Sequence, residues 1–298
     1  MTADPRHLDR LAILIMLGLC LSWGFNQIAA KVALADIPPL TQAGLRSLGG
    51  AIILGVFGFW REKNLLKADG TLAAGVFAGV LFAGEFVALY LGLQWTSASH
   101  AVLFLYSAPF FVALGLLILV PQERLNRIQW IGLTLAFAGV ALALGVSGSA
   151  SREVLIGDLL CLIGGALWAA TTIVVKTTNL RYAPPVKTLL YQLAISAPLL
   201  LLGAWAMNEK WPTAISTISA WSMAYQTFWV VSVTFLLWFW MVQNYRAGEL
   251  SAFTFLTPIF GVIAGWLLLE DKLSTGFITA VACVAAGIAM VNWPTKKA

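Results

Sequence analysis

Two ionisable residues stand out because each lies deep inside an apolar stretch of the sequence. Glu85 is the one carboxylate at such a depth, and Arg46 lies at a similar depth in the preceding stretch. If both stretches are membrane helices, each residue is roughly 12 Å below the same surface, at a rise of 1.5 Å per residue. Burying an ionisable group there costs about 3 kcal/mol or more, so such residues are functional candidates. Three uses remain open: an ion pair between two helices, recognition of a charged substrate group and, for Glu85, proton relay.

A second candidate group combines a tryptophan with amides. Trp23, Asn26 and Gln27 share one face of a helix, and a similar arrangement returns at Trp168 and Thr172. Amide side chains need partners in an apolar surrounding, so they face the interior of a helix bundle. An aromatic ring beside amides suits an amphipathic, amino-acid-like solute, although the same amides can serve only to hold helices together.

Four further side chains are candidates for the wall of a cavity. Trp238 and Trp240 are two residues apart and therefore point about 200° apart on a helix, and we expect Trp238 to face inward. Tyr106 and Phe255 each lie three residues before a proline in an apolar stretch, where they can line a path or pack ordinarily. Gln192 is the fourth candidate.

The sequence carries no signature of an enzyme. It lacks HExxH, paired CxxC, GxSxG, GxxxxGK[ST] and any acid-rich cluster, so we expect no catalytic residue, no metal, no cofactor and no direct use of ATP. A membrane-embedded enzyme and a channel are the rival classes, and neither has a motif in its favour.

Composition places most of the chain in a lipid bilayer. Of its 298 residues 60% are hydrophobic and only 10% are charged, against about 25% charged in a soluble domain. Crossing a membrane takes about 20 apolar residues. Stretches of that kind are predicted at 11–34, 38–59, 71–93, 99–119, 128–147, 155–177, 185–206, 219–242, 250–269 and 275–293.

The loops predict the orientation. Most loop Lys and Arg residues lie on the side that holds the N-terminus, and cytoplasmic loops are rich in these residues. With an even number of spans, both termini are then expected in the cytoplasm; the resemblance to a family described below implies in addition that the membrane is a bacterial inner membrane.

The two halves of the chain resemble each other. "LSWGFNQIAAK" in the first half matches "ALWAATTIVVK" in the second, and "YSAPFF" matches "FLTPIF". The spacing predicts two repeats of five helices, over 11–147 and 155–293. Because five is odd, the second repeat enters the membrane from the opposite side, and inverted repeats of this kind are typical of transporters. We therefore expect an all-α membrane protein of ten helices, built as two inverted repeats.

The matched prolines predict hinges. Pro109 and Pro258 occupy equivalent positions in the two repeats, and a proline inside a helix removes a hydrogen bond and bends it. Gly115 and Gly261 follow them, where glycine either adds freedom or lets helices pack closely. We expect both helices to bend near these prolines.

Several motifs together resemble a known family. "SWGFNQIAAK", Arg46, "LYLGLQWTSASHAVLFLYSAPFFVALGLLILVPQERL" and the shorter "GELSAFTFLTPIFGVIAGWLLLEDKL" are similar to the EamA type of the drug/metabolite transporter superfamily, over nearly the whole chain. Within it, the chain looks most like the bacterial exporters of amino acids, including aromatic ones. The resemblance implies a ten-helix basket around a central cavity and export of small metabolites.

The expected function is accordingly secondary transport. We expect the chain to export small metabolites, amino acids first, by alternating access, with drugs or nucleotide-precursor metabolites as the alternative cargo. The expected partners are a small molecule and membrane lipid, without nucleic acid, and a monomer is compatible with this function.

Overall fold

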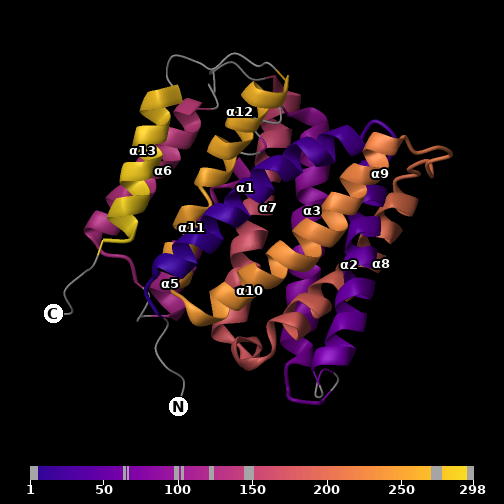
Figure 1. Cartoon of the computed structure of the whole chain (residues 1–298), viewed down its shortest axis with the longest axis horizontal. Helices are drawn as coiled ribbons and strands as arrows, with labels where there is room; N and C mark the ends of the chain where they lie inside the picture. The colour runs from indigo at the N-terminus through magenta and orange to yellow at the C-terminus, as the bar shows by residue number, and fades with distance from the viewer. Residues whose placement is uncertain are drawn as a thin grey trace.

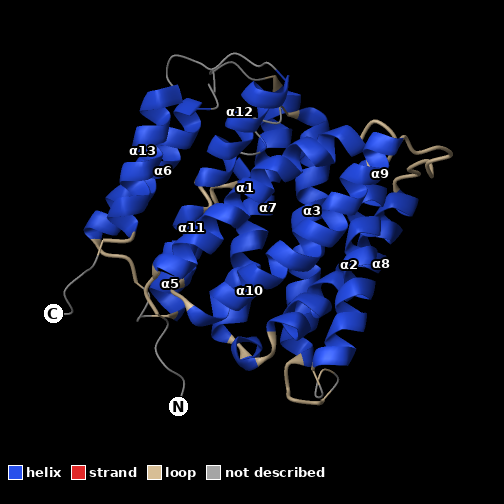
Figure 2. Ribbon diagram, in the orientation of Figure 1, coloured by secondary structure: helices blue, strands red, loops and turns tan. Residues whose placement is uncertain are grey.

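A computed structural model describes residues 6–62, 65, 67–96, 101, 104–120, 124–143, 151–269 and 277–293. Helices make up almost all of these ranges, as Figure 2 shows. Across them, strand-like pairing is limited to an isolated bridge between Arg6 and Tyr245. The prediction of an all-α protein is confirmed.

The first half of the chain forms the helices that Figure 1 colours from indigo to magenta. They are α1 (Arg10–Ala33), α2 (Pro39–Arg61), α3 (Leu72–Trp95), α5 (Ala108–Leu119) and α6 (Arg127–Ala143).

The second half adds the helices α7 (Arg152–Thr177), α8 (Pro185–Ala206), α9 (Thr217–Ala224), α10 (Phe235–Asn244), α11 (Ala247–Phe253), α12 (Leu256–Leu269) and α13 (Phe277–Val291). A short 3₁₀ turn, η2 (Asn179–Tyr182), precedes α8, and a π-helical segment, η3 (Tyr225–Thr234), joins α9 to α10.

Six helical segments in the described ranges are long and apolar enough to cross a membrane, one of them running from α9 through η3 to α10. Shorter apolar helices account for the other predicted stretches. The fourth and ninth predicted stretches are shorter because each is interrupted, which is described below with the site.

Local signals in the sequence explain where several helices begin. The Asp9 side chain accepts a hydrogen bond from the backbone N–H of Ala12 and caps α1. Pro39 and Pro185 open α2 and α8, where the missing N–H of proline costs no helical hydrogen bond. The Glu209 carboxylate accepts from the backbone N–H groups at the start of α2, and a negative charge there also favours the helix dipole.

Helices from the two halves pack against each other in pairs. The most extensive contacts join α6 to α13, α3 to α7, α2 to α8, α3 to α8 and α1 to α12. The first of these pairs lies along the left edge of Figure 1. Its backbones meet so closely that a Cβ atom on Gly287 would lie 2.5 Å from the carbonyl oxygen of Gly132. The two halves therefore interlock and share their interior.

Candidate functional site: a cavity between the two halves

A cavity of about 820 Å³, including the space at its open mouth, lies inside the bundle. Helices α1, α2, α3, α7 and α10, together with η3 and the segment before α5, contribute to its wall. The residues that line it are Trp23, Asn26, Ala30, Arg46, Phe82, Glu85, Phe86, Leu89, Tyr90, Leu93, Leu105, Tyr106, Trp168, Thr171, Val230, Phe235, Trp238 and Phe239.

The cavity lies toward one end of the bundle. Ala30 is near the last turn of α1, Arg46 is near the first turns of α2, and Leu93 is in the last turn of α3. These helix ends meet at the end of the bundle opposite the start of α1. We call this the far end, and the end where α1 begins the N-terminal end.

Aromatic rings form a continuous group along the cavity. Trp23 is at its centre, with ring centroids 6.4 Å from Trp168, 5.6 Å from Trp238 and 6.3 Å from Phe235. The Tyr106 ring packs edge-on against Trp168 at 5.4 Å. Trp23 and Trp168 are equivalent in the two repeats, so the repeats meet at this pair of rings.

The same group continues to Arg46. Phe82 lies 6.0 Å from Phe235 and 4.8 Å from Phe86, again between ring centroids. The Arg46 guanidinium stacks over the Phe86 ring, with its central carbon 4.1 Å from the centroid. One end of the aromatic group therefore carries a positive charge, which the face of the ring stabilises.

Arg46 and Glu85 share the cavity without forming an ion pair. Arg46 is 1% exposed, and its Nε and Nη2 atoms have no hydrogen-bond partner among the residues that the structure describes. Glu85 is 7% exposed, and no salt bridge within 4.0 Å joins it to Arg46. A structural ion pair, one of the three uses considered from the sequence, is absent from this conformation.

The π-helical segment η3 helps to place the tryptophans. The widened turn ends at Thr234, whose hydroxyl accepts a hydrogen bond of 3.0 Å from the Trp23 indole. Phe235 and Trp238 follow immediately and line the cavity. Trp238 points inward, as expected, and its own indole N–H is buried without a partner in the described part of the chain.

Three other candidates from the sequence, Thr172, Gln192 and Phe255, lie elsewhere. Thr172 faces a second, smaller space, bounded also by Pro109 and Thr254. Gln192 is 0% exposed and donates to the backbone carbonyl of Thr188, outside the cavity. Phe255 is also 0% exposed and packs near Phe137. The side chain of Gln27 lies outside the described residues.

The α-helical pattern is interrupted in both proline-containing segments, where we expected bends. The chain turns at Tyr106 and Ser107 before α5 begins at Ala108, and at Thr254 and Phe255 before α12 begins at Leu256. Pro109 and Pro258 thus lie in the first turn of a new helix. The proline N atom lacks a hydrogen there, but the first N–H groups of a helix have no helical partner in any case.

Hydroxyl groups add to the backbone hydrogen bonds at the two breaks. Ser107 Oγ donates to the carbonyl of Phe104 at 2.6 Å, and Thr254 Oγ1 donates to the carbonyl of Ser251 at 2.6 Å. The same carbonyls also accept from the backbone N–H groups of Ser107 and Thr254, so backbone hydrogen bonding continues where the α-helical pattern stops. Unpaired backbone groups in a membrane are costly, so this continued pairing makes the breaks tolerable.

Each break packs against the first helix of the other repeat. At the second break, the Cys20 thiol of α1 donates to the carbonyl of Phe253. At the first, a Cβ on Gly165 of α7 would lie 2.7 Å from the carbonyl oxygen of Leu105. Gly261 approaches Gly24 of α1, and Gly115 faces Ile173 of α7, so both predicted hinge glycines are sites of close helix packing.

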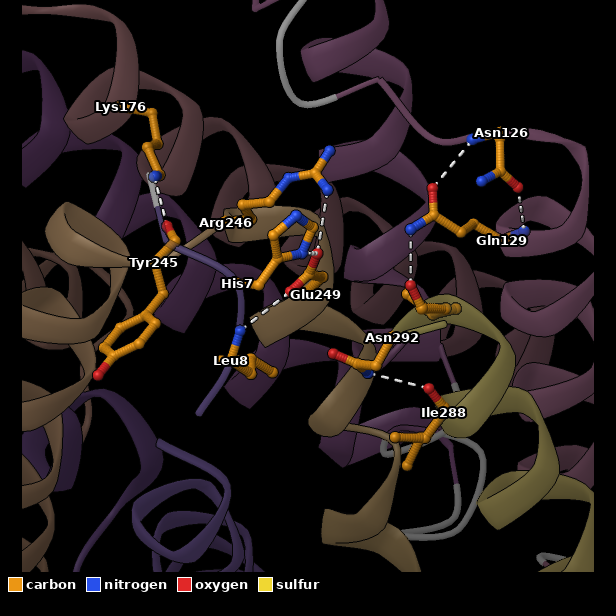
Figure 3. A network of polar contacts seen from close by, with 11 residues as sticks. His7, Leu8, Asn126, Gln129, Lys176, Tyr245, Arg246, Glu249, Ile288 and Asn292 are labelled. Carbon is orange, nitrogen blue, oxygen red and sulfur yellow. Dashed lines mark hydrogen bonds and ion pairs between the residues drawn. The ribbon is translucent and has the colours of Figure 1, made fainter. Parts of the chain in front are cut away.

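Polar contacts close the N-terminal end, as Figure 3 shows. The buried Glu249 carboxylate of α11 is bonded to His7 Nδ1 at 2.7 Å, to Arg246 at 3.1 Å and to the backbone N–H of Leu8 at 3.2 Å. Lys176 donates to the carbonyl of Tyr245 close by. The segment before α1 is therefore fastened to the junction between α10 and α11.

Other contacts tie the last helix to this end. Gln129 of α6 donates to the carbonyl of Val291 in α13, and Gln129 and Asn126 cap each other's backbone at the start of α6. The cavity is thus placed toward the far end while the N-terminal end is held closed.

Sequence reasoning missed one wall of the cavity. Phe82, Phe86 and Tyr90 line it from α3 together with Leu89 and Leu93. Aromatic residues at i, i+4 and i+8 share one helix face, and this spacing was the available signal.

Each half of the chain matches a known family of proteins. The model of the EamA-like transporter family matches residues 10–145 and, a second time, residues 155–293. The chain belongs to the EamA-like transporter family. It is therefore a multi-pass membrane transporter with two family repeats and not an enzyme, as the sequence predicted.

Individual relatives agree with this assignment. The chain is 26% identical to a transporter of Bacillus subtilis, YoaV, itself described as uncharacterized, over 93% of this chain and 96% of that one. It is 29% identical to a probable amino-acid metabolite efflux pump of Escherichia coli, over 85% of each chain. A solved crystal structure shares the fold with a TM-score of 0.77 at 17% identity, over 93% of this chain and 94% of the other.

Proposed function

We propose that this EamA-family transporter exports amino acids or closely related small metabolites across a bacterial inner membrane by alternating access. The cavity between the halves is the substrate site, and its opening alternates between the far end and the N-terminal end. Both termini are cytoplasmic, in keeping with the Lys and Arg of the loops at the N-terminal end.

One observation carries the proposal: equivalent residues of the two repeats occupy unequal surroundings. Arg46 and Tyr106 line the cavity, whereas their equivalents Gln192 and Phe255 are also buried but do not line it. An inverted pair of repeats can exchange the conformations of its halves. After that exchange, Gln192 and Phe255 would line a cavity open to the N-terminal end.

The two breaks are the proposed hinges. The first break lines the cavity at Tyr106, and the second borders, at Thr254, the smaller space that Trp168 shares with the cavity. Each is held by hydrogen bonds within its own turn, so it can change angle without exposing further backbone groups to lipid. In this conformation the contacts of Glu249 hold α11 closed against the segment before α1. Export would require these contacts to open when the far end closes.

Amino acids fit the cavity in two respects. Its aromatic wall accommodates an apolar side chain, and Arg46 and Glu85 offer one charge of each sign. The printed description of the E. coli relative as a probable amino-acid metabolite efflux pump also supports this cargo. Drugs and nucleotide-precursor metabolites are the alternative cargo.

Counterflow in proteoliposomes tests the proposal. Vesicles preloaded with an unlabelled compound should take up the same labelled compound transiently, and the panel should contain apolar and aromatic amino acids, cationic drugs and nucleosides. We expect saturable counterflow of at least one amino acid. Exchange of drugs or nucleosides alone would overturn the amino-acid assignment, and unsaturable flux would indicate a channel.

A further inference from the structure

We propose that Arg46 and Glu85 form a charged end of the cavity, which selects substrates that carry one carboxylate and one ammonium group. Arg46 receives the carboxylate, Glu85 receives the ammonium group, and the substrate's apolar part lies among the tryptophans. This inference rests on the proposed function and adds the roles of the individual residues.

Arg46 has the properties of a carboxylate receptor. Its Nε and Nη2 atoms are buried and without a partner in the described ranges, while the ring of Phe86 supports the guanidinium from one face. A guanidinium presents neighbouring N–H groups that match the two oxygens of a carboxylate. Leaving such donors unpaired in a buried site is costly, so a ligand that supplies two acceptors is strongly favoured.

Two acceptors line the same cavity. Glu85 lines it from α3 without a hydrogen bond or ion pair to another described residue, and Asn26 Oδ1 on α1 is buried without a described partner. An ammonium group has three donors and no acceptor, so these two oxygens suit it. The other titratable side chains of the cavity wall are the hydroxyls of Tyr90 and Tyr106.

The balance of charge determines which ligands fit. With Arg46 positive and Glu85 negative, a zwitterion pairs both groups, whereas a ligand with one charge leaves the other residue buried and unpaired. A buried charge that lacks its partner is strongly unfavourable, because nothing compensates for its removal from water. Cationic drugs and simple carboxylates should therefore bind more weakly than an amino acid with the same apolar group.

The apolar part of the substrate has a defined place. Trp23, Trp168 and Trp238 lie within 5.6 to 6.4 Å of one another between ring centroids, beyond Phe82 and Phe86 as seen from Arg46. The unpartnered Trp238 indole N–H adds one donor to this region.

Three compounds of similar size distinguish recognition of the carboxylate from recognition of the ammonium group. Phenylalanine carries both groups, 3-phenylpropionate carries only the carboxylate, and phenethylamine carries only the ammonium group.

Competition against labelled phenylalanine in counterflow measures the selectivity of three proteins. The wild-type protein should prefer phenylalanine to the other two probes. Glu85→Gln leaves a positive site and should bind phenylalanine about 10- to 150-fold more weakly while gaining preference for 3-phenylpropionate. Arg46→Gln leaves a negative site and should shift in the opposite direction, toward phenethylamine. If both variants lose phenylalanine binding but their preferences for the other two probes do not shift in opposite directions, the proposed roles of Arg46 and Glu85 are wrong.

Control variants keep the test decisive if one substitution disturbs folding. Glu209→Gln neutralises a carboxylate that caps α2 outside the cavity, and it should leave the order of the three probes unchanged. Arg46→Lys keeps the positive charge but loses the neighbouring N–H groups of the guanidinium, so this variant should bind phenylalanine more weakly and still reject phenethylamine. Ligand-induced shifts in the unfolding temperature of the detergent-solubilised protein give the same order without transport. If Arg46→Lys or Glu209→Gln accepted phenethylamine as readily as Arg46→Gln, the assignment would be wrong.

Failure of this inference is distinct from failure of the proposed function. If the wild-type protein exchanges amino acids but the two charge variants do not shift in opposite directions, only the residue roles are wrong. If the wild-type protein exchanges no amino acid, the proposed cargo itself is wrong.

Discussion

Replacing Gly24 by alanine tests whether the packing of α1 against α12 controls the conformational change. A Cβ atom at this position would lie 2.9 Å from the backbone N of Gly261, 3.0 Å from the carbonyl oxygen of Thr257 and 3.1 Å from Cβ of Phe260. Two of these atoms are backbone, so the contact can be relieved only if the helices move apart. Overpacking of this kind typically costs about 1–3 kcal/mol.

The cost falls on the conformation described here, in which α1 and α12 are in contact. If the other conformation separates them, about 1–3 kcal/mol changes the equilibrium between the two about 5- to 150-fold. Gly24→Ala should therefore lower the unfolding temperature in detergent and slow counterflow. Because Gly24 does not line the cavity, half-saturation by substrate should change little.

Gly18→Ala is the matched control. Gly18 lies in the same helix, and a Cβ there would meet nothing within 4 Å. The control should be as stable as the wild-type protein or slightly more so, since alanine favours a helix by about 1 kcal/mol over glycine. If Gly24→Ala and Gly18→Ala behave alike in both assays, the proposed role of the contact is refuted.

Three other substitutions test contacts at the ends of the bundle. Glu249→Gln should weaken the fastening of the segment before α1 and increase its amide hydrogen exchange; unchanged protection would contradict the closed end described here. Glu209→Ala removes the acceptor for the first N–H groups of α2 and should destabilise the protein by about 0.5–2 kcal/mol. Thermal unfolding measures this loss, and an unchanged melting curve would show that water replaces the Glu209 carboxylate as the acceptor. The hydrogen bond from Lys187 lowers the pKa of Asp69 from 3.8 to about 2, so Asp69 contributes stability above pH 4 that is lost as the pH falls toward 2. Lys187→Met should flatten the pH dependence of the unfolding temperature between pH 4 and pH 2, and an unaltered slope would mean that other groups cause it.

Much of the fold could be predicted because a bilayer leaves few alternatives. Apolar stretches of about 20 residues must be helices, and matched prolines at Pro109 and Pro258 indicated equivalent irregularities in two repeats. The sequence did not show whether these would be bends or breaks. At both positions the backbone N–H bonds the carbonyl three residues back, and the hydroxyls of Ser107 and Thr254 donate to the same carbonyls.

The site could be predicted only in part, since equivalence between repeats is not equivalence of surroundings. Pairing by position placed Gln192 with Arg46 and Phe255 with Tyr106, but only the first-repeat member of each pair lines the cavity. In any one conformation of an inverted-repeat protein the two repeats differ in structure. The sequence pattern does not indicate which of the two equivalent residues then lines the cavity. The aromatic face of α3 was missed for another reason: that helix is apolar on all sides, so its cavity face does not differ in polarity from its lipid face.

The central claim is that one cavity opens alternately to the two ends, and labelling of single cysteines tests it most directly. In a variant without the native cysteines, Tyr106→Cys and Phe255→Cys report on equivalent positions, the first on the cavity wall and the second packed. Membrane-impermeant thiol reagents are applied from each side, with and without transported substrate. We predict that Tyr106→Cys reacts from the far end, and that Phe255→Cys reacts from the N-terminal end only when substrate is being exchanged. If Phe255→Cys never reacts from the N-terminal end during exchange, the two repeats do not exchange conformations and the alternating-access account is wrong.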